Sequence, residues 1–420
     1  MQSNINKIFK NFESTGTKTF SLADDPPVFV EGHGSTLIDT KAKKYIDMAT
    51  GSAVSILGHG HKKISLALQK QLNTGISHLG PHFHTKPHIE IFKKLRRLFP
   101  KEFTHFHPAT NGTEATEVAL KAAMYKTDRS QFLAFWGSYH GRTSGSLAVS
   151  SLKGGNNAKY GPYMPLTQFL PYATKKSEVE PYLKIARTTI NSSWTGSGPY
   201  AGIIIEPMQG SGGVRIPQKK FIKGIAKIAK EKNIPLIFDE IFTGFGRTGN
   251  MFAHRYFNVI PDIVILSKAI GGGIPTGMVV AKNSFLNKWS SGTQSSTFQM
   301  HPFAAAAGCA LIEALDEDNL ISRAKKIGKI FKKREKQISK FSCVKEMRGL
   351  GAMQGIEIQK NGKPDKQLAK KIRLEALKKG LITYECGING NVIGLMPPLV
   401  ITDDELNKGI EIIINSIKKH

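Results

Sequence analysis

Short apolar runs alternate with helical patterns through the middle of the chain. Four of these runs have the length of buried strands: 132–136, 202–205, 236–238 and 263–266. Amphipathic spacing over 179–190 and 221–232 predicts helices between them. This alternation of strand and helix is typical of an α/β domain with a mainly parallel sheet.

Two of the strand-like runs lead into residues with reactive side chains. Asp239 follows the run 236–238, and Lys268 comes shortly after the run 263–266. Because chemistry gathers at the carboxyl ends of strands in open α/β sheets, we expect Asp239 and Lys268 at one edge of one sheet. A lysine amine forms a Schiff base with an aldehyde. An aspartate stabilises a protonated pyridine nitrogen, so the pair indicates a site for pyridoxal 5′-phosphate (PLP).

The segment around this pair resembles a known family. Residues 236–273, LIFDEIFTGFGRTGNMFAHRYFNVIPDIVILSKAIGGG, are similar to the signature of the class III aminotransferases. These belong to the fold type I PLP enzymes and include ornithine, acetylornithine and 4-aminobutyrate aminotransferases. The resemblance, which covers nearly the whole chain, implies that Lys268 bonds to PLP and that Asp239 pairs with its ring nitrogen.

The same resemblance implies the architecture. We expect a large domain with a mainly parallel seven-stranded sheet flanked by helices, and a smaller α+β domain built from both termini. The N-terminal arm and part of the small domain are predicted in 1–70, the PLP-binding domain in 71–318 and the remainder of the small domain in 319–420. In the N-terminal hairpin the family has a glycine where this chain has Ala42, so we expect a different turn there. Asp403 or Asp404 is the expected cap of the last helix.

A helix start supplies a candidate phosphate site. Asn111, Gly112 and Thr113 precede a helical pattern over 114–125. Free backbone N–H groups and the helix dipole favour an anion there, and the threonine adds a hydroxyl. A plain helix cap explains the same residues. The stretch resembles the phosphate-binding turn of the family, which implies that Gly112 and Thr113 hold the PLP phosphate.

Two further stretches resemble the family's cofactor surroundings. In GSYHGRTSGS, Tyr139 matches the aromatic residue that stacks on the PLP ring, and His140 completes the motif. Glu206 matches a glutamate that supports the cofactor region, although a structural acid is an equally simple reading.

Arg142 and Phe242 are the candidate substrate residues. An arginine binds a carboxylate through two hydrogen bonds, and the family often uses Arg142 in this way; a structural ion pair is the alternative. Phe242 stands where many members have glutamine, which makes the surroundings of the cofactor more apolar.

Ser296 and Thr297 resemble a hydroxyl pair at the subunit interface of the family. Thr297 matches the threonine that reaches the PLP phosphate of the other subunit, which implies a homodimer with two shared active sites. Gln299, Met300 and His301 stand where the family usually has two glycines and an asparagine. Larger side chains near the partner's cofactor therefore change the expected shape of the pocket.

Two departures bear on the substrate. Members that use glutamate carry an arginine at the position of Gly394 and a glutamate at the position of Ser211. Both are missing. Their joint loss has a physical reason, because a buried glutamate without the arginine would be an unpaired charge, which is costly. The usual binding mode of glutamate is therefore not expected. An amino donor other than glutamate, a carboxylate clamp built from Arg142, or an amine substrate would each fit this chain.

The charge of the chain is unusual. Its 59 Lys+Arg and 32 Asp+Glu give a formal net charge of +27. The lysines are dispersed over helical segments, as expected of solvated basic faces, and no nucleic-acid-binding motif accompanies them. We expect no nucleic acid partner; an acidic carrier protein that presents the substrate is a weaker hypothesis.

Several functional classes are disfavoured. The apolar runs are too short for membrane spans, and the start of the chain lacks a signal-peptide core, so a cytoplasmic enzyme is expected. Three unpatterned cysteines argue against a disulfide framework or zinc site. Four histidines in 78–88 suggest a metal only weakly, because the spacing brings no Cys or acid, so we expect none.

The expected function is transfer of an amino group between an amine or amino acid and a keto acid or aldehyde. A PLP-dependent aminomutase or racemase of the same fold is the alternative, since such enzymes need no external acceptor. A basic partner-binding protein with a relic site is a more distant one.

Overall fold

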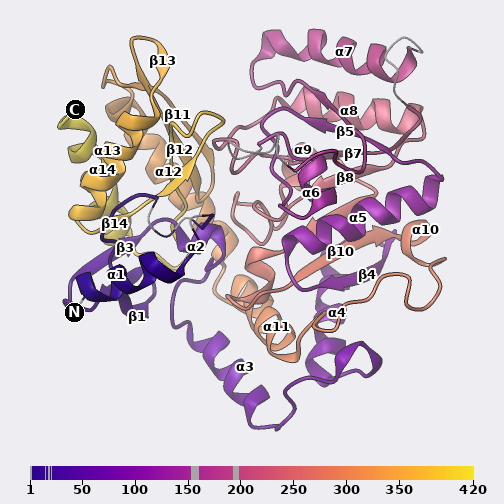
Figure 1. Cartoon of the computed structure of the whole chain (residues 1–420), viewed down its shortest axis with the longest axis horizontal. Coiled ribbons are helices and arrows are strands. Elements are labelled where there is room, and N and C mark those ends of the chain that lie inside the picture. The colour runs from indigo at the N-terminus through magenta and orange to yellow at the C-terminus, as the bar shows by residue number, and fades with distance from the viewer. Residues whose placement is uncertain (1, 15, 18, 20, 153–159, 193–197) are drawn as a thin grey trace. The chain divides into compact units, whose positions relative to one another are not determined.

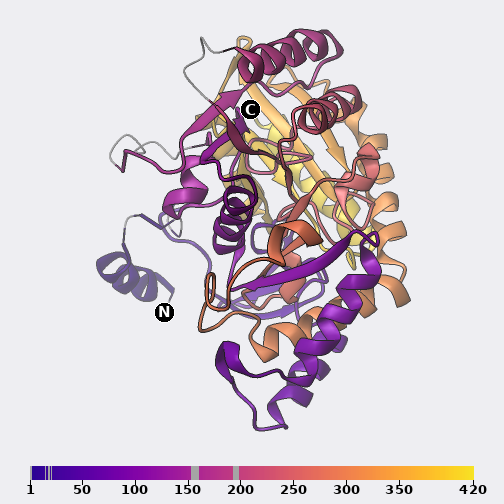
Figure 2. The same cartoon turned by 90° about the vertical axis from the view of Figure 1, so that its right-hand side faces the viewer.

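The computed structural model describes residues 2–14, 16–17, 19, 21–152, 160–192 and 198–420 (Figures 1 and 2). The chain divides into two compact units. One comprises Met1–His61 and Lys325–His420, and the other comprises Lys62–Ala324. The smaller unit is thus assembled from both ends of the sequence, and the larger unit from one continuous stretch.

A seven-stranded sheet forms the centre of the larger unit. Its order is β4-β10-β9-β8-β7-β5-β6. β10 runs antiparallel to both of its neighbours, whereas β9, β8, β7, β5 and β6 are parallel to one another. The prediction of a mainly parallel seven-stranded sheet is therefore confirmed. The strands are β4 (Phe103–Ala109), β5 (Gln131–Phe135), β6 (Thr167–Leu170), β7 (Tyr200–Ile205), β8 (Leu236–Asp239), β9 (Ile263–Leu266) and β10 (Gly277–Lys282).

Helices cover both faces of this sheet, as Figure 1 shows. The helices of this unit are α3 (Lys62–Leu72), α4 (Lys86–Leu98), α5 (Gly112–Thr127), α6 (Ser144–Ala148), α7 (Val179–Asn191), α8 (Lys219–Glu231), α9 (Ala253–Phe257), α10 (Asn283–Leu286) and α11 (Pro302–Glu317), with 3-10 turns η1 (Gly80–His82), η3 (Lys176–Glu178) and η5 (Lys268–Gly271).

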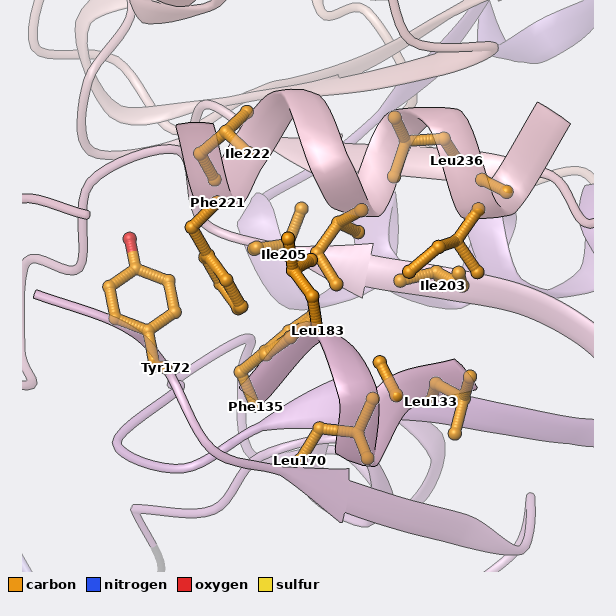
Figure 3. Close-up of a cluster of buried hydrophobic side chains, with 14 of the residues drawn as sticks. Leu133, Phe135, Leu170, Tyr172, Leu183, Ile203, Ile205, Phe221, Ile222 and Leu236 are labelled. Carbon is orange, nitrogen blue, oxygen red and sulfur yellow. The ribbon is translucent and has the colours of Figure 1, made fainter. Parts of the chain in front are cut away.

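Each face of the sheet has its own apolar core. Figure 3 shows Phe135 of β5, Ile205 of β7 and Phe221 of α8 in one cluster, which Leu183 of α7 completes. On the other face, the alanine-rich side of α5 packs against strands β5, β7, β8 and β9. Small side chains let α5 approach the sheet closely, and this brings its N-terminal end to the edge where β8 ends.

The smaller unit contains two further sheets. Their orders are β1-β2-β3-β14 and β11-β12-β16-β15, with β13 paired to β12. The elements are α1 (Gln2–Phe12), β1 (Phe29–His33), β2 (Thr36–Asp39), β3 (Lys44–Asp47), α2 (Thr50–Ala53), β11 (Val344–Leu350), β12 (Met353–Lys360), β13 (Lys363–Pro364), α13 (Lys366–Lys378), β14 (Leu381–Ile382), β15 (Tyr384–Cys386), β16 (Val392–Leu395) and α14 (Asp403–Lys418), while α12 (Leu320–Ile338) begins in the larger unit.

Two local expectations for this unit are wrong. Ala42 keeps a positive φ of 59° in the turn between β2 and β3, so the turn survives the loss of glycine. The Ala42 N–H donates to Asp39 O at 2.9 Å, and Asp39 accepts from the N–H groups of Lys41 and Lys43. These bonds offset the strain at Ala42. The cap of α14 is Thr402, whose side chain forms a capping box with Glu405, rather than Asp403 or Asp404.

Candidate active site

The ends of β8 and β9 bring Asp239 and Lys268 to one edge of the large sheet. Asp239 is the last residue of β8 and pairs in register with Ile265 of β9. Lys268 opens η5, two residues after β9 ends. Because β8 and β9 are parallel, both side chains start from the carboxyl edge, as their positions in the sequence predict.

Asp239 is held by two hydrogen bonds from different parts of the chain. Its Oδ2 lies 2.7 Å from Nδ1 of His140, and its Oδ1 accepts from the Ile241 N–H at 2.9 Å. Asp239 is 3% exposed and His140 2%. A buried carboxylate needs such partners. The second ring nitrogen of His140, Nε2, is buried and makes no hydrogen bond to the described residues.

Lys268 has an unusual backbone and an unusual amine. Its φ of 49° lies in the left-handed region that lysine rarely adopts. Its Nζ lies 3.4 Å from the centroid of the Phe242 ring. Burial lowers the pKa of Lys268 from 10.5 to about 7, although the negative charges of Asp239 and Glu206 oppose this shift. An amine with a pKa near neutrality can be a base at ordinary pH.

Glu206 follows strand β7 and ties the loop of Tyr139 to the site. Its two carboxylate oxygens accept from the N–H groups of Tyr139 and Gly210, each at 2.9 Å. Burial raises the pKa of Glu206 to about 7, with the charge of Asp239 adding to the rise and that of His140 opposing it. Glu206, Asp239 and Lys268 therefore form one electrostatically linked group.

The N-terminal end of α5 presents backbone donors. Asn111 caps the helix by accepting from the Glu114 N–H at 3.0 Å. Among the described residues, no hydrogen-bond acceptor faces the N–H groups of Gly112 and Thr113. The Thr113 hydroxyl points to the loop that follows β5, where it accepts from the N–H groups of Arg142 and Thr143. The structure thus leaves the backbone of this turn open to an anion.

Gly141 shows how closely this loop approaches α5. Its φ is +142°, and a Cβ there would lie 2.2 Å from Thr113 Oγ1 and 2.4 Å from Ser146 Oγ. A larger residue would therefore displace the hydroxyl groups that fix the loop. Ser146 and Thr143 have no motif of their own, so only the tertiary structure identifies them as supports.

Tyr139 and Arg142 lie at the outer side of the same loop. The Arg142 guanidinium carbon is 5.7 Å from the centroid of the Tyr139 ring, which is a cation–π distance. Arg142 is exposed, and Tyr139 is half-buried. Tyr139 is thus linked to the group around Asp239 through Glu206, which accepts from its N–H. Arg142 is linked to that group through its contact with the Tyr139 ring.

Ser296 and Thr297 are not connected to that group within the described chain. Thr297 is exposed, and its backbone oxygen bonds to His78 Nε2. The His78 ring stacks on His301 with a centroid distance of 5.0 Å and an interplanar angle of 4°. No local sequence pattern predicts this contact of His78, because the two segments are 219 residues apart.

The fold and these strand-end residues define a PLP-dependent enzyme of fold type I. Residues 21–417 match the family model described as aminotransferase class-III. The chain belongs to this family. It is 33% identical to an acetylornithine aminotransferase of Methanopyrus kandleri, over 94% of this chain and 95% of the relative. It is also 32% identical to an alanine/serine racemase of Pyrococcus horikoshii, over 96% and 87% of the two chains.

Solved structures agree with the fold. A Bacillus anthracis aminotransferase superposes with a TM-score of 0.91 at 24% identity, covering 100% of this chain and 98% of that one. At this level of identity the likeness shows the fold alone. The enzyme is a class III aminotransferase, and its cofactor is PLP.

The donor set of the site fits PLP. The open N–H groups at α5 suit its phosphate, the buried Asp239 suits its ring nitrogen, and the Lys268 amine suits its aldehyde. Within the described residues, no three His, Cys, Asp or Glu side chains gather as a metal ion requires. In the same part of the chain, none of the helices combines the length and apolar content needed to cross a bilayer.

Proposed function

We propose that Lys268 is the proton-transfer residue of this aminotransferase and that Asp239 controls the cofactor's ring nitrogen. The observation that carries the proposal is the Lys268 amine, whose pKa burial lowers to about 7, beside the buried Asp239. When bound, PLP supplies an electron sink for the bond broken at the donor carbon. Lys268 Nζ takes the proton from that carbon and returns a proton when the amino group is transferred.

The other residues hold the cofactor and limit its freedom. The N–H groups of Gly112 and Thr113 would bind the phosphate of PLP, and the Tyr139 ring would pack on the face of the cofactor. Glu206 keeps the loop of Tyr139 in place through its backbone bond. His140 orients Asp239. The Phe242 ring covers one side of Lys268 Nζ, whose distance to the ring centroid is 3.4 Å.

The substrate is an amine or an amino acid that does not use the glutamate clamp of the family. Gly394 lies on β16, and a Cβ there would lie 3.2 Å from Tyr384 and Met396 side-chain atoms. An arginine at this position therefore requires its neighbours to move. Arg142, which is exposed beside Tyr139, is the cation proposed to bind a donor's distal carboxylate.

The working form is a homodimer with shared sites. Exposure of Thr297 and of the neighbouring Phe298, which is 60% exposed, supports this proposal. In the dimer Thr297 reaches the phosphate of the partner's cofactor. A cytoplasmic setting is supported by the three free cysteines, Cys309, Cys343 and Cys386. An acidic carrier protein stays a prediction, and salt-dependent binding is its test.

Racemisation is the second candidate function. The racemase-named relative and the missing clamp favour it, because a racemase needs no acceptor. In that reaction a single amino acid loses its α-proton and regains a proton on the opposite face of the α-carbon. The Lys268 amine transfers the proton on one of these two faces.

One experiment separates the two functions. The purified PLP form is mixed with a panel of amines and amino acids without a keto acid. Stoichiometric formation of pyridoxamine phosphate identifies the amino donors and supports transamination. Loss of optical activity with the cofactor unchanged supports racemisation. In either case Lys268→Ala should not turn over, and retained turnover would disprove the role of Lys268.

A further inference from the structure

A second cavity lies at the amino edge of the large sheet. Its volume is about 860 Å³. Leu236, the first residue of β8, and Lys282, the last residue of the antiparallel β10, both line it. The candidate active site is at the carboxyl ends of β8 and β9. The two sites are therefore at opposite ends of the same short strands, and this groove goes beyond the proposed function.

Basic side chains dominate the groove. Asp262 is the acidic residue among those that line it, and the basic ones are Lys126, Arg129, Lys223, Lys227, Lys230 and Lys282. They come from the end of α5, from α8 and from β10, which are distant in the sequence. Segments that converge in this way produce a concentrated positive potential, which attracts anions.

Three of the lysines form no ion pair with any described residue, and neither does Arg129, which donates to the Tyr200 backbone oxygen. Lys282 is paired with Asp262 at 2.7 Å, and Lys227 lies 3.7 Å from Glu231. Lys126, Lys223 and Lys230 make no ion pair with any described residue. Lysines in the last turn of a helix are ordinary, because they complement the helix dipole. That explains Lys126 and Lys230, whereas Lys223 stands in the first half of α8.

An apolar wall lies beside the cations. Ile234, Val259 and Phe285 line the groove from buried positions, and Ile260 lines it with 54% of its surface exposed. A cavity of this size, with an apolar wall and a few convergent charges, has the character of a small-molecule site.

We propose that this groove binds a small polyphosphate. Its phosphates contact Lys126, Lys223 and Lys230, and any organic part packs against Ile260. Lysine ammonium groups are point-charge donors suited to phosphate oxygens. The cavity holds one small molecule, which favours a compact polyanion over a nucleic acid strand.

The floor of the groove connects to the active-site strands. Asp262 Oδ2 accepts from the Leu236 N–H at 2.9 Å, and its Oδ1 accepts from Lys282 Nζ at 2.7 Å. The Lys282 N–H in turn donates to Asp262 O at 3.1 Å. Asp262 thus joins the starts of β8 and β9 to the end of β10.

Calorimetric titration of the PLP-loaded enzyme tests the proposal, because bound PLP keeps the active-site phosphate turn filled. Inorganic tripolyphosphate, ATP and adenosine are titrated at about 0.15 M ionic strength, where charges are screened beyond roughly 8 Å. The test variant carries Lys126→Gln, Lys223→Gln and Lys230→Gln. The matched control carries Lys329→Gln, Lys333→Gln and Lys336→Gln, three exposed lysines of α12 with the same change in charge.

We expect tripolyphosphate and ATP to bind and adenosine not to bind. The groove variant should lose affinity by about ten-fold or more, equivalent to about 1.4 kcal/mol, while the control keeps it. Equal losses in both variants, or no binding of tripolyphosphate, would overturn the proposal. Binding of an oligonucleotide at this groove without binding of tripolyphosphate would also overturn it, in favour of a nucleic acid surface.

Discussion

The Nδ1 atom of His140 lies 2.7 Å from Oδ2 of Asp239, and both side chains are buried. The histidine therefore fixes the orientation of a carboxylate that the proposed mechanism requires to stay charged. In the proposed mechanism Asp239 would keep the ring nitrogen of bound PLP protonated, whereas His140 would act through Asp239 as a positioning residue. The two roles predict different reductions of kcat when each residue is replaced.

Asp239→Asn should lower kcat by roughly 100- to 1,000-fold, as expected for loss of a preorganised electrostatic partner. His140→Ala should lower kcat by about 10- to 100-fold, the value of a hydrogen bond to a charged group. The measurements are steady-state kinetics and the absorption spectrum of the bound cofactor, which reports the protonation of its ring. An unchanged spectrum in both variants would refute the link between Asp239 and the ring nitrogen.

The lowered pKa of Lys268, which is half-buried, predicts a pH-dependent stability of the apoprotein. Burial lowers its pKa from 10.5 to about 7. Below pH 7 the lysine is charged in the folded and unfolded states, so the full cost of burying its charge is present. Between pH 7 and 10.5 the folded protein holds the neutral amine, and this cost fades as the pH rises.

Lys268→Met should therefore stabilise the apoprotein more at about pH 6 than at about pH 9. The difference should be about 3 kcal/mol, because the cost fades over the two units from pH 7 to pH 9 at about 1.4 kcal/mol for each unit. Urea unfolding at both pH values measures it. The same comparison in a Glu206→Gln background removes the linked titration of Glu206, whose pKa is also about 7. Equal stabilisation at the two pH values would contradict the lowered pKa.

Gly141 should tolerate no side chain. Gly141→Ala places a Cβ 2.2 Å from Thr113 Oγ1 in a backbone with φ +142°. We expect a loss of about 2–3 kcal/mol in the free energy of unfolding, from overpacking added to strain. The matched control is Gly292→Ala, where φ is +84° and no atom lies within 4 Å of the added Cβ. This control carries the strain alone and should lose about 1 kcal/mol.

The Gly141→Ala change should also weaken PLP binding, because the Thr113 hydroxyl anchors the loop of Arg142 and Thr143 beside the phosphate turn. Titration of the apoprotein with PLP measures the affinity. If the two glycine variants lose equal stability and keep equal PLP affinity, the close approach has no role in the site.

His78 should act on the cofactor through Thr297. His78→Phe keeps an aromatic ring against His301 but removes the bond to the Thr297 oxygen. We expect PLP affinity to fall by about 2- to 10-fold, the net value of one hydrogen bond. The matched control is His301→Phe, which keeps both the stacking and the bond. Equal losses in the two variants would show that the hydrogen bond from His78 does not position Thr297.

The strand ends were the most predictable part of the site. Apolar runs of three and four residues identify buried strands locally, and the parallel topology then places Asp239 and Lys268 at one edge. The match to the family signature adds the cofactor and the class of enzyme. The start of α5 was predictable for the same reason, because caps and helix patterns are local.

Contacts between distant segments were not predictable. The bond from the Arg142 N–H to the Thr113 hydroxyl joins residues 29 apart, and no local pattern predicts it. Ala42 was expected to avoid a positive φ, yet the bonds of Asp39 hold it there. In both cases the competing partners lie in the folded structure, and no local propensity reveals them.

The sequence by itself determined the fold class, the family, and the lysine and aspartate on which the proposed chemistry rests. These depend on periodicity and on motifs read within a few residues. Only the tertiary structure decided which side chains are removed from water and which of them form hydrogen bonds with each other. His140 and Asp239 are 99 residues apart in sequence. The pKa of Lys268 falls because the fold removes it from water, and burial and proximity are properties of the folded chain.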